Sequence, residues 1–446
     1  MARGTLLARG WIVTLAGLGI NCALGVLYAW SVVAKTLTAE WGWSAGEASL
    51  PYAMAVGVFA LSMVFAGRAQ DRLGPRVVAT LGGVLTGSGL MLAGLAGPDR
   101  AWPVVAGFGL LAGMGIGLGY ASATPAAVKW FPPARKGLIT GIVVSGFGLA
   151  SVYIAPLTNT LLASRGVSET FFILGGVFLV VCVTLAQLLK NPPAGYVPEG
   201  VKAPPAPTAG APALAVAGAA AADPPAEVDH DPDYDWREMV RTRQFALLWM
   251  MYAFSAFAGL MIIGHMAKIA AAQLTGVELG FLLVAVLAIG NAAGRIVAGI
   301  VSDRIGELKT MFAVFALQAG LMLALAQATT PTLLALAAAS VGFCYGANLS
   351  LFPSTTAGFF GTKHLGVNYG WMFTAYGAGG IAGPYLAARL MRISANTEYL
   401  VEVGGVTLVR TFEVGDYRPA FLVAGIACLL AAGLAFFLKK PAVADG

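Results

Sequence analysis

One arginine lies far inside an apolar stretch of the sequence. The stretch FLLVAVLAIGNAAGRIVAGIVSDRIG places Arg295 eight residues before Asp303, which is about 12 Å along a helix. A guanidinium removed from water is costly unless an anion accompanies it. Its planar fork of N–H donors fits a carboxylate through two parallel hydrogen bonds. We therefore favour an anionic ligand over the alternatives, in which backbone carbonyls satisfy Arg295 or its side chain extends back to water.

Other side chains at a similar depth complete the candidate site. Asn291 lies one helical turn before Arg295 on the same face, so it is expected either to orient Arg295 or to contact the ligand. Tyrosine hydroxyls and an asparagine amide suit a hydroxyl or keto group beside a carboxylate, and Leu27 and Phe373 suit a short alkyl tail. The remaining candidates, each equally compatible with ordinary packing, are Tyr28, Tyr120, Tyr345, Asn348 and Tyr376.

The composition shows what kind of element must position these residues. Of the 446 residues, 58% are hydrophobic and 11% are charged, whereas soluble domains carry about 25% charged residues. Such a chain is expected in a lipid bilayer. The net charge of +6 does not indicate nucleic-acid binding, because the basic residues gather in short loops. The four cysteines lie in apolar runs and are expected to be small buried residues.

Sequence motifs of enzymes and cofactor sites are absent. No HEXXH, GxSxG or P-loop pattern occurs, and no cluster has metal-ligand spacing. GMGIGLG at 113–119 lies inside an apolar run with no preceding strand, so close helix packing explains it better than a dinucleotide loop. We expect no enzyme activity, no cofactor and no metal.

Twelve apolar runs are long enough to cross a bilayer, which needs about 20 residues per helix. Six precede residue 191 and six follow residue 243, so we predict two six-helix halves, 1–190 and 243–446. The segment 191–242, rich in Pro, Ala and Gly and acidic near its end, is predicted to be a flexible linker. The runs are 10–34, 48–66, 76–97, 102–128, 137–163, 169–189, 244–271, 279–301, 309–328, 331–357, 365–390 and 418–438.

The distribution of Lys and Arg predicts the orientation in the membrane. Loops on the linker's side and both termini carry most of the basic residues, so both termini and the linker are expected to be cytoplasmic. The opposite side has one long loop, 392–417. Within it, YLVEVGGVTLVRTF alternates apolar and polar residues around Gly404-Gly405, which predicts an extracellular β-hairpin.

A short polar motif occurs twice in the sequence. GRAQDRLGPR at 67–76 returns as GIVSDRIGEL at 299–308, each time between the second and third helices of a half. Such a repeat indicates duplication of a six-helix unit, as in transporters whose halves rock against each other. The two aspartates are expected to cap a helix end or pair with arginines across the halves, and so to latch one conformation; the alternative is a plain tight turn. The latch candidates are Gly67, Asp71, Arg72, Arg76, Asp303 and Arg304.

These motifs resemble a known family. The pattern G-x3-D-R-x-G-x-R between helices 2 and 3, with its partner between helices 8 and 9, resembles the signature loop of the major facilitator superfamily. The stretch GMGIGLGYASATPAAVKWFPPARKGLITGIVVSGFGLASVYIAPL is similar to the monocarboxylate transporters and the oxalate/formate antiporter group. The resemblance implies an all-α membrane protein with twelve transmembrane helices in two pseudo-symmetric bundles.

The resemblance also assigns individual positions. In that group a helix-8 arginine holds the carboxylate, and Arg295 falls on this position. Asn291 stands where proton-coupled members usually carry an aspartate, and Val32 is the nearest match to their helix-1 lysine, which argues against that form of proton coupling. Tyr376 replaces the helix-11 lysine of the oxalate exchangers. One central cation instead of two favours a monoanion.

We therefore predict a monomeric secondary active transporter in a prokaryotic cytoplasmic membrane. Its substrate is a small organic anion of the monocarboxylate class, such as lactate or pyruvate, moved by alternating access, with a proton as the candidate co-substrate. The alternatives are an oxalate/formate-type anion exchanger, an anion channel and a membrane sensor that binds the anion without transporting it. A sensor would need a signalling domain, and a channel a continuous basic pore; the sequence indicates neither.

Overall fold

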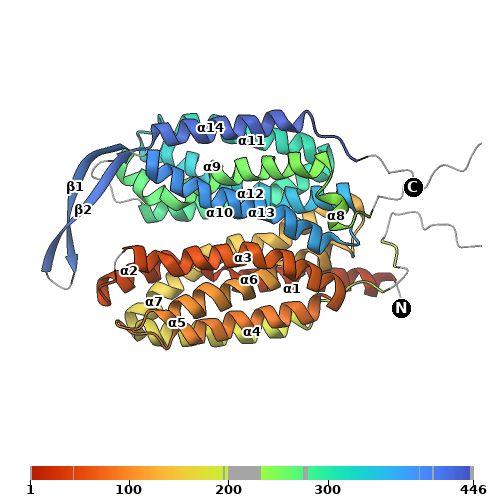
Figure 1. The fold of residues 1–446 in the computed structure, drawn as a ribbon, viewed down its shortest axis with the longest axis horizontal. Helices are drawn as coiled ribbons and strands as arrows, with labels where there is room; N and C mark the ends of the chain where they lie inside the picture. The colour runs from red at the N-terminus through yellow and green to blue at the C-terminus, as the bar shows by residue number, and fades with distance from the viewer. Residues whose placement is uncertain are drawn as a thin grey trace, which may run out of the picture.

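The computed structural model shows two layers of helices that run in roughly the same direction (Figure 1). It describes residues 3–43, 45–193, 196–198, 233–274, 280–390, 392–403 and 406–441. Helices α1–α7, here called the N-terminal half, form one layer, and α8–α14, the C-terminal half, form the other. Most of the predicted linker, 199–232, lies outside the described residues.

The N-terminal half is helical almost throughout its described length. A 3-10 turn interrupts the first span, and a π-helical segment lies in the first part of the fourth, just before the glycine-rich α6. The elements are α1 (Arg3–Leu24), η1 (Gly25–Ala29), α2 (Trp30–Glu40), α3 (Ala45–Leu73), α4 (Pro75–Ala93), α5 (Trp102–Val104), η2 (Val105–Ala112), α6 (Gly113–Val128), η3 (Pro133–Arg135) and α7 (Lys136–Ala186).

The C-terminal half begins inside the residues predicted as linker. Asp235 and Glu238 form a capping box around the short helix α8, so the prediction of a flexible linker up to 242 is wrong at this end. A capping box satisfies two backbone donors reciprocally and stabilises even a short helix. The elements are α8 (Trp236–Met239), α9 (Arg243–Gln273), α10 (Gly280–Ile305), α11 (Glu307–Leu325), α12 (Pro331–Phe360), α13 (Leu365–Leu390), β1 (Arg392–Val403), β2 (Val406–Asp416) and α14 (Arg418–Ala435).

The helices account for the predicted twelve membrane crossings. In the part of the chain that the structure describes, ten helical segments are long and apolar enough to cross a membrane. One of them, α7, contains two helices that meet at Gly166, where φ is 74°. Glycine adopts this left-handed conformation without the penalty of a side chain. The less apolar α13 has 26 residues, about 39 Å of helix, and supplies the remaining crossing.

The outward surface of the bundle is apolar, as a bilayer requires. Large hydrophobic side chains such as Phe65, Ile381 and Phe436 are between 67% and 75% exposed. Exposed apolar side chains on this scale would be unfavourable in water, whereas lipid tails solvate them. The protein is a multi-pass, all-α membrane protein.

The two ends of the bundle differ. The start of α1 and the end of α14 lie together at one end, here called the termini end, and the β1–β2 hairpin projects from the other, the hairpin end (Figure 1). The strands pair antiparallel, with Val403 opposite Val406 and an irregularity between Ile393 and Ala395. The predicted hairpin is therefore present, while Gly404 and Gly405 lie outside the described residues.

Close helix packing holds the segment that carries Arg295. Glycines of α10 and α12 allow the two backbones to touch: a Cβ atom on Gly294 would lie 2.0 Å from the carbonyl oxygen of Phe343, and one on Gly346 2.0 Å from that of Asn291. Any larger residue would force the helices apart, as in small-residue interfaces of membrane helices generally. The position of Arg295 is thus set by a rigid helix pair.

Candidate functional site

Arg295 is completely buried between the two halves. Its Nε donates to Asn291 Oδ1 at 3.1 Å, and its Nη1 donates to the carbonyl oxygen of Val144 in the opposite half. Its Nη2 has no hydrogen-bond partner within the described residues. The absence of a side chain at Gly148 makes room for the guanidinium, since a Cβ there would lie 3.2 Å from Nε. The guanidinium is therefore oriented but incompletely satisfied.

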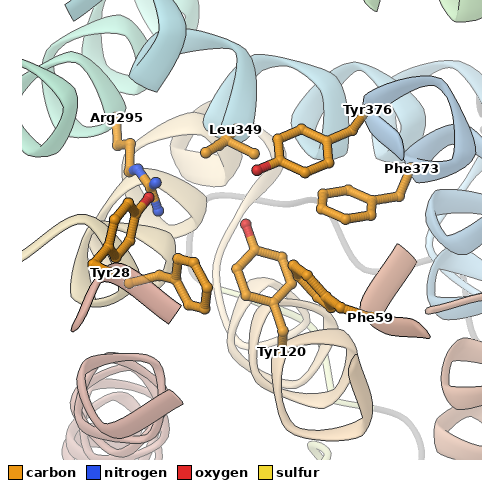
Figure 2. Close-up of a pocket in the computed structure, with 8 residues that line it drawn as sticks. Tyr28, Phe59, Tyr120, Arg295, Leu349, Phe373 and Tyr376 are labelled. Atoms are coloured by element: carbon orange, nitrogen blue, oxygen red, sulfur yellow. The ribbon is translucent and has the colours of Figure 1, made fainter. Parts of the chain in front are cut away.

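A small cavity adjoins this guanidinium. Its empty volume, including the space at its open side, is about 190 Å³. Figure 2 shows the phenol groups of Tyr28, Tyr120 and Tyr376 pointing toward the space beside Arg295. Both halves contribute side chains to its wall. The lining residues are Tyr28, Phe59, Tyr120, Phe147, Arg295, Leu349, Phe373 and Tyr376.

Five predicted residues thus meet at one cavity, namely Arg295, Tyr28, Tyr120, Phe373 and Tyr376. Aromatic packing joins them across the halves. The ring centroids of Tyr120 and Phe373 are 5.8 Å apart, and those of Phe373 and Tyr376 are 4.6 Å apart. An aromatic wall with one cation suits a small anion that carries an apolar part.

Four other predicted residues lie outside the lining. Asn291 accepts the hydrogen bond of Arg295 Nε, a contact that suits the orienting role considered for it. Its Nδ2 is 3.5 Å from the Tyr28 hydroxyl. The Tyr345 hydroxyl bonds that of Tyr376 at 2.8 Å. Asn348 donates to Ser255 Oγ at 2.7 Å. Leu27 is buried but does not line the cavity.

Three lining residues were missed by the sequence analysis. Phe59, Phe147 and Leu349 form part of the wall, with Phe59 5.2 Å from Phe373 between ring centroids. Apolar residues within apolar helices look alike in a sequence, whether they face lipid, core or cavity. Phe59 stands 232 positions before Asn291, the spacing of the two repeated loops, and only this correspondence could have suggested it.

The electrostatics of the cavity favour an anion. Arg295 is the one charged residue of its lining, and no carboxylate lines the described cavity. The Tyr120 hydroxyl, also buried, makes no hydrogen bond of ordinary geometry to any described group, although Tyr369 lies near enough to interact with it. Arg295 Nη2 and Tyr120 are both donors. A ligand with two acceptor oxygens would satisfy them together.

The repeated polar loops contact the opposite half at the termini end. Asp303 accepts hydrogen bonds from the backbone N–H groups of Gly137 and Leu138, both at 2.8 Å. Asp71 accepts one from Val367 N at 3.0 Å. Each aspartate thus lies at the start of a helix, α7 or α13, of the other half, where a carboxylate is favourable.

Glycines make this approach possible in both copies. A Cβ on Gly67 would lie 2.0 Å from the carbonyl oxygen of Gly366, and one on Gly137 2.4 Å from that of Gly299. The arginines of the loops, Arg72, Arg76 and Arg304, are exposed instead. The termini end is therefore closed, and the capping geometry, rather than ion pairing with arginines, joins the halves.

Two layers of apolar helices with a cavity between them are the arrangement found in many secondary transporters. Comparison with known proteins agrees. A family model described as Major Facilitator Superfamily matches residues 13–384 and 274–445, and the chain belongs to this superfamily. Its members are transporters rather than enzymes, and the hypothesis of a sensor that does not transport finds no support.

Individual relatives confirm the predicted subgroup. The chain is 28% identical over 407 residues to the oxalate:formate antiporter of Oxalobacter formigenes, an alignment that covers 89% of this chain and 88% of that protein. It is 28% identical over 404 residues to monocarboxylate transporter 11 of Mus musculus, covering 85% and 81%. The solved structure of the proton:xylose symporter XylE superposes with a TM-score of 0.65 at 13% identity, over 97% and 96% of the chains, which shows the shared fold.

Proposed function

We propose that the protein is a secondary active transporter for a small monocarboxylate of the lactate or pyruvate type. The observation that carries this proposal is the Nη2 group of Arg295, a buried cationic donor that faces the cavity between the halves without a partner in the described chain. A substrate carboxylate would accept its hydrogen bonds and compensate its charge. Without an anion, the buried charge is strongly unfavourable.

The presence of a single cation in the cavity lining supports a monoanion as the substrate. In a poorly solvated cavity each substrate charge requires compensation, and Arg295 alone supplies it here. Tyr120 and Tyr28 lie where they could donate to a second oxygen of the substrate, and Phe373 and Leu349 could pack on a short alkyl group. The names of two relatives, a monocarboxylate transporter and an oxalate:formate antiporter, support small carboxylates as the substrate class.

Alternating access is the mechanism that the duplicated contacts support. Asp71 and Asp303 would hold the termini end closed and release it when the halves rock, so that the cavity opens to one side at a time. The basic loops support a cytoplasmic location of the termini end in a prokaryotic inner membrane. Arg295, Tyr28 and Tyr376 would then move relative to one another as the cavity opens.

Counterflow in proteoliposomes tests the proposal. Vesicles containing the purified protein are loaded with unlabelled lactate or pyruvate and diluted into the labelled acid. We expect transient accumulation of the label, suppressed by external monocarboxylates much more than by oxalate or succinate. A protein that accumulates none of the acids in the panel would contradict a carrier for carboxylates.

An oxalate/formate-type exchanger is the second candidate. The similarity to the antiporter of Oxalobacter formigenes over nearly the whole chain favours it. The same assay separates the two, because an exchanger of this type would accumulate labelled oxalate against internal formate. The replacement of the second cation by Tyr376 leads us to expect the opposite preference.

A further inference from the structure

The Tyr376 hydroxyl is bonded to a second tyrosine that lies behind the cavity wall. Tyr345 of α12 does not line the cavity and is only 2% exposed. Its hydroxyl oxygen lies 2.8 Å from that of Tyr376 on α13. Within the described residues, this is the hydrogen bond that each of the two hydroxyls makes. The pair therefore has two O–H protons and one bond between them.

Close packing holds Tyr345 in place. A Cβ atom on Gly259 of α9 would lie 2.6 Å from Tyr345 Cδ2, so the ring lies directly against the α9 backbone. The helix that carries Tyr345 is fixed as well, because a Cβ on Gly342 would lie 2.1 Å from the carbonyl oxygen of Leu287 on α10. Such glycine contacts leave little freedom for a helix or a ring between its neighbours. The Tyr345 hydroxyl is therefore a fixed group.

Tyr376 is held from other sides by aromatic rings. Its ring stacks on Phe373 with centroids 4.6 Å apart and planes 18° apart, and it packs on Tyr252 at 6.2 Å. Figure 2 shows its hydroxyl directed toward Arg295 across the cavity. An acid held by its carboxylate on Arg295 thus turns its remaining atoms toward the Tyr376 hydroxyl.

The direction of the hydrogen bond decides what Tyr376 offers to such a ligand. Either oxygen can be the donor. If Tyr376 donates, the proton of Tyr345 stays behind the wall without a second acceptor among the described groups. If Tyr345 donates, the remaining proton belongs to Tyr376 and faces the cavity, where a ligand oxygen accepts it. A buried donor without an acceptor is destabilising, so a ligand with an oxygen at this place favours Tyr345 as the donor.

We infer that Tyr345 is a positioning residue that donates to Tyr376 and so directs the Tyr376 O–H toward an oxygen on the carbon next to the substrate carboxylate. A hydroxyl that accepts one hydrogen bond donates another more strongly. The site therefore selects 2-hydroxy and 2-oxo acids over unsubstituted acids of the same length. The inference rests on the proposed function, because it needs Arg295 to hold the carboxylate.

Isothermal titration of the purified protein with lactate, pyruvate and propionate tests the inference. Propionate has the same number of carbons but no oxygen next to its carboxylate. We expect the wild type to bind lactate or pyruvate at least about fivefold more tightly than propionate. Tyr376→Phe should remove most of this preference and leave the Kd for propionate unchanged. Oxalate also carries an oxygen at this place, so the balance between lactate and oxalate does not measure the bond.

Tyr345→Phe separates positioning from packing, because it keeps the ring against Gly259 and removes only the hydroxyl. The preference over propionate should fall about two- to fivefold, with propionate binding unchanged. In the background Tyr376→Phe, Tyr345→Phe should have no further effect on the preference, since it acts only through Tyr376.

Tyr252→Phe is the matched control. It also removes a buried hydroxyl from a ring that packs on Tyr376. The Tyr252 hydroxyl makes no hydrogen bond of ordinary geometry to any described group, although Tyr369 lies near enough to interact with it. The preference over propionate should therefore be that of the wild type.

The sign of the Tyr345→Phe effect is decisive. A rise in the preference would mean that Tyr376 donates to Tyr345 and is freed by the substitution, which would overturn the inference. An equal loss in Tyr252→Phe, or a Tyr345→Phe effect that persists with Tyr376→Phe, would overturn it too. Equal binding of all three acids by the wild type overturns the inference but leaves the proposed function standing. A wild type that binds none of them overturns both.

Discussion

The contacts at the termini end repeat between the halves, whereas the cavity lining does not. Gly67 and Gly299, and Asp71 and Asp303, are pairs of residues 232 positions apart that make corresponding contacts with the opposite half. By the same spacing, Arg295 corresponds to Met63 and Asn291 to Phe59. The C-terminal half therefore supplies a cation with its orienting amide, whereas at the corresponding positions the N-terminal half has Met63, which does not line the cavity, and the Phe59 ring, which does.

This difference reflects what each region must contact. At the termini end an aspartate meets backbone N–H groups, which every helix start offers, so either copy of the loop can make the same contact. In the cavity, a monoanion needs one compensating cation, and a second would remain unpaired at considerable cost. Duplication thus persists where the partner is backbone and is absent in the cavity, where the proposed function places a ligand.

The strongest test removes the cation, Arg295, from the cavity. Arg295→Ala should weaken carboxylate binding by at least about 30-fold, since loss of one partner of a buried charge pair costs about 2–5 kcal/mol. Arg295→Lys should also bind poorly, because an ammonium lacks the planar fork. Isothermal titration or a thermal-shift assay with lactate and pyruvate measures this.

The control for that test is Arg165→Ala. Arg165 is exposed and pairs with Glu169 at 3.7 Å, so the variant should bind lactate and pyruvate as the wild type does. Arg295→Ala should still fold and insert, because it removes an unfavourably buried charge. Near wild-type binding by a folded Arg295→Ala protein would refute the assignment of the site.

Adding a second cation should make the cavity more symmetric. Tyr376→Lys would place an ammonium across from Arg295, and preference should move from monocarboxylates toward oxalate by about tenfold or more. Tyr376→Phe, which introduces no charge, should not shift the preference. Competition against labelled lactate at several pH values measures it, because a buried lysine can lose its proton. If oxalate never competes better with Tyr376→Lys than with wild type, Tyr376 does not face the substrate.

The two latches should differ in strength despite their shared sequence. Asp303 accepts well-formed hydrogen bonds at both carboxylate oxygens, whereas Asp71 Oδ1 accepts none of ordinary geometry, although the Gly366 N–H lies near enough to interact with this carboxylate. Asparagine can replace one acceptor but not two. Asp303→Asn should therefore raise the ratio of open to closed populations at the termini end about tenfold, and Asp71→Asn should raise it less than about fivefold. The reason is that each charge-assisted hydrogen bond contributes about 1.5–3 kcal/mol.

Spin-label distances and transport rates measure both variants, and substrate affinity within the closed state should be unchanged. Equal and negligible effects would favour the plain-turn alternative for both loops. A larger effect of Asp71→Asn would contradict the inference drawn from the number of hydrogen bonds.

The smallest expected effect concerns the space behind Arg295. Gly148→Ala places a Cβ 3.2 Å from Arg295 Nε, so the guanidinium must shift by a few tenths of an ångström, and the Kd for the carboxylate should rise about three- to tenfold. Gly176→Ala, in the second of the two helices of α7, meets only Met91 at 3.5 Å and should not change binding. Tighter binding in Gly148→Ala would mean that the observed guanidinium position is not the binding position.

The sequence alone determined the membrane class, the duplicated loops and the central cation. These features rest on local chemistry: long apolar runs require lipid, and Arg295 stands out because a charge in such a run is costly. The capping box of Asp235 and Glu238 was equally local, but the proline- and alanine-rich context concealed it.

Only the tertiary structure decided which side chains share the cavity. Phe59 and Leu349 could not be told from core or lipid-facing residues, and Asn348 and Tyr345, at the same depth, turned out to bond Ser255 and Tyr376 instead. The rotation of each helix follows from how glycines such as Gly294 and Gly346 let α10 and α12 approach. Depth in the membrane is a property of position in the chain, whereas the direction of a side chain depends on the packing of every neighbouring helix.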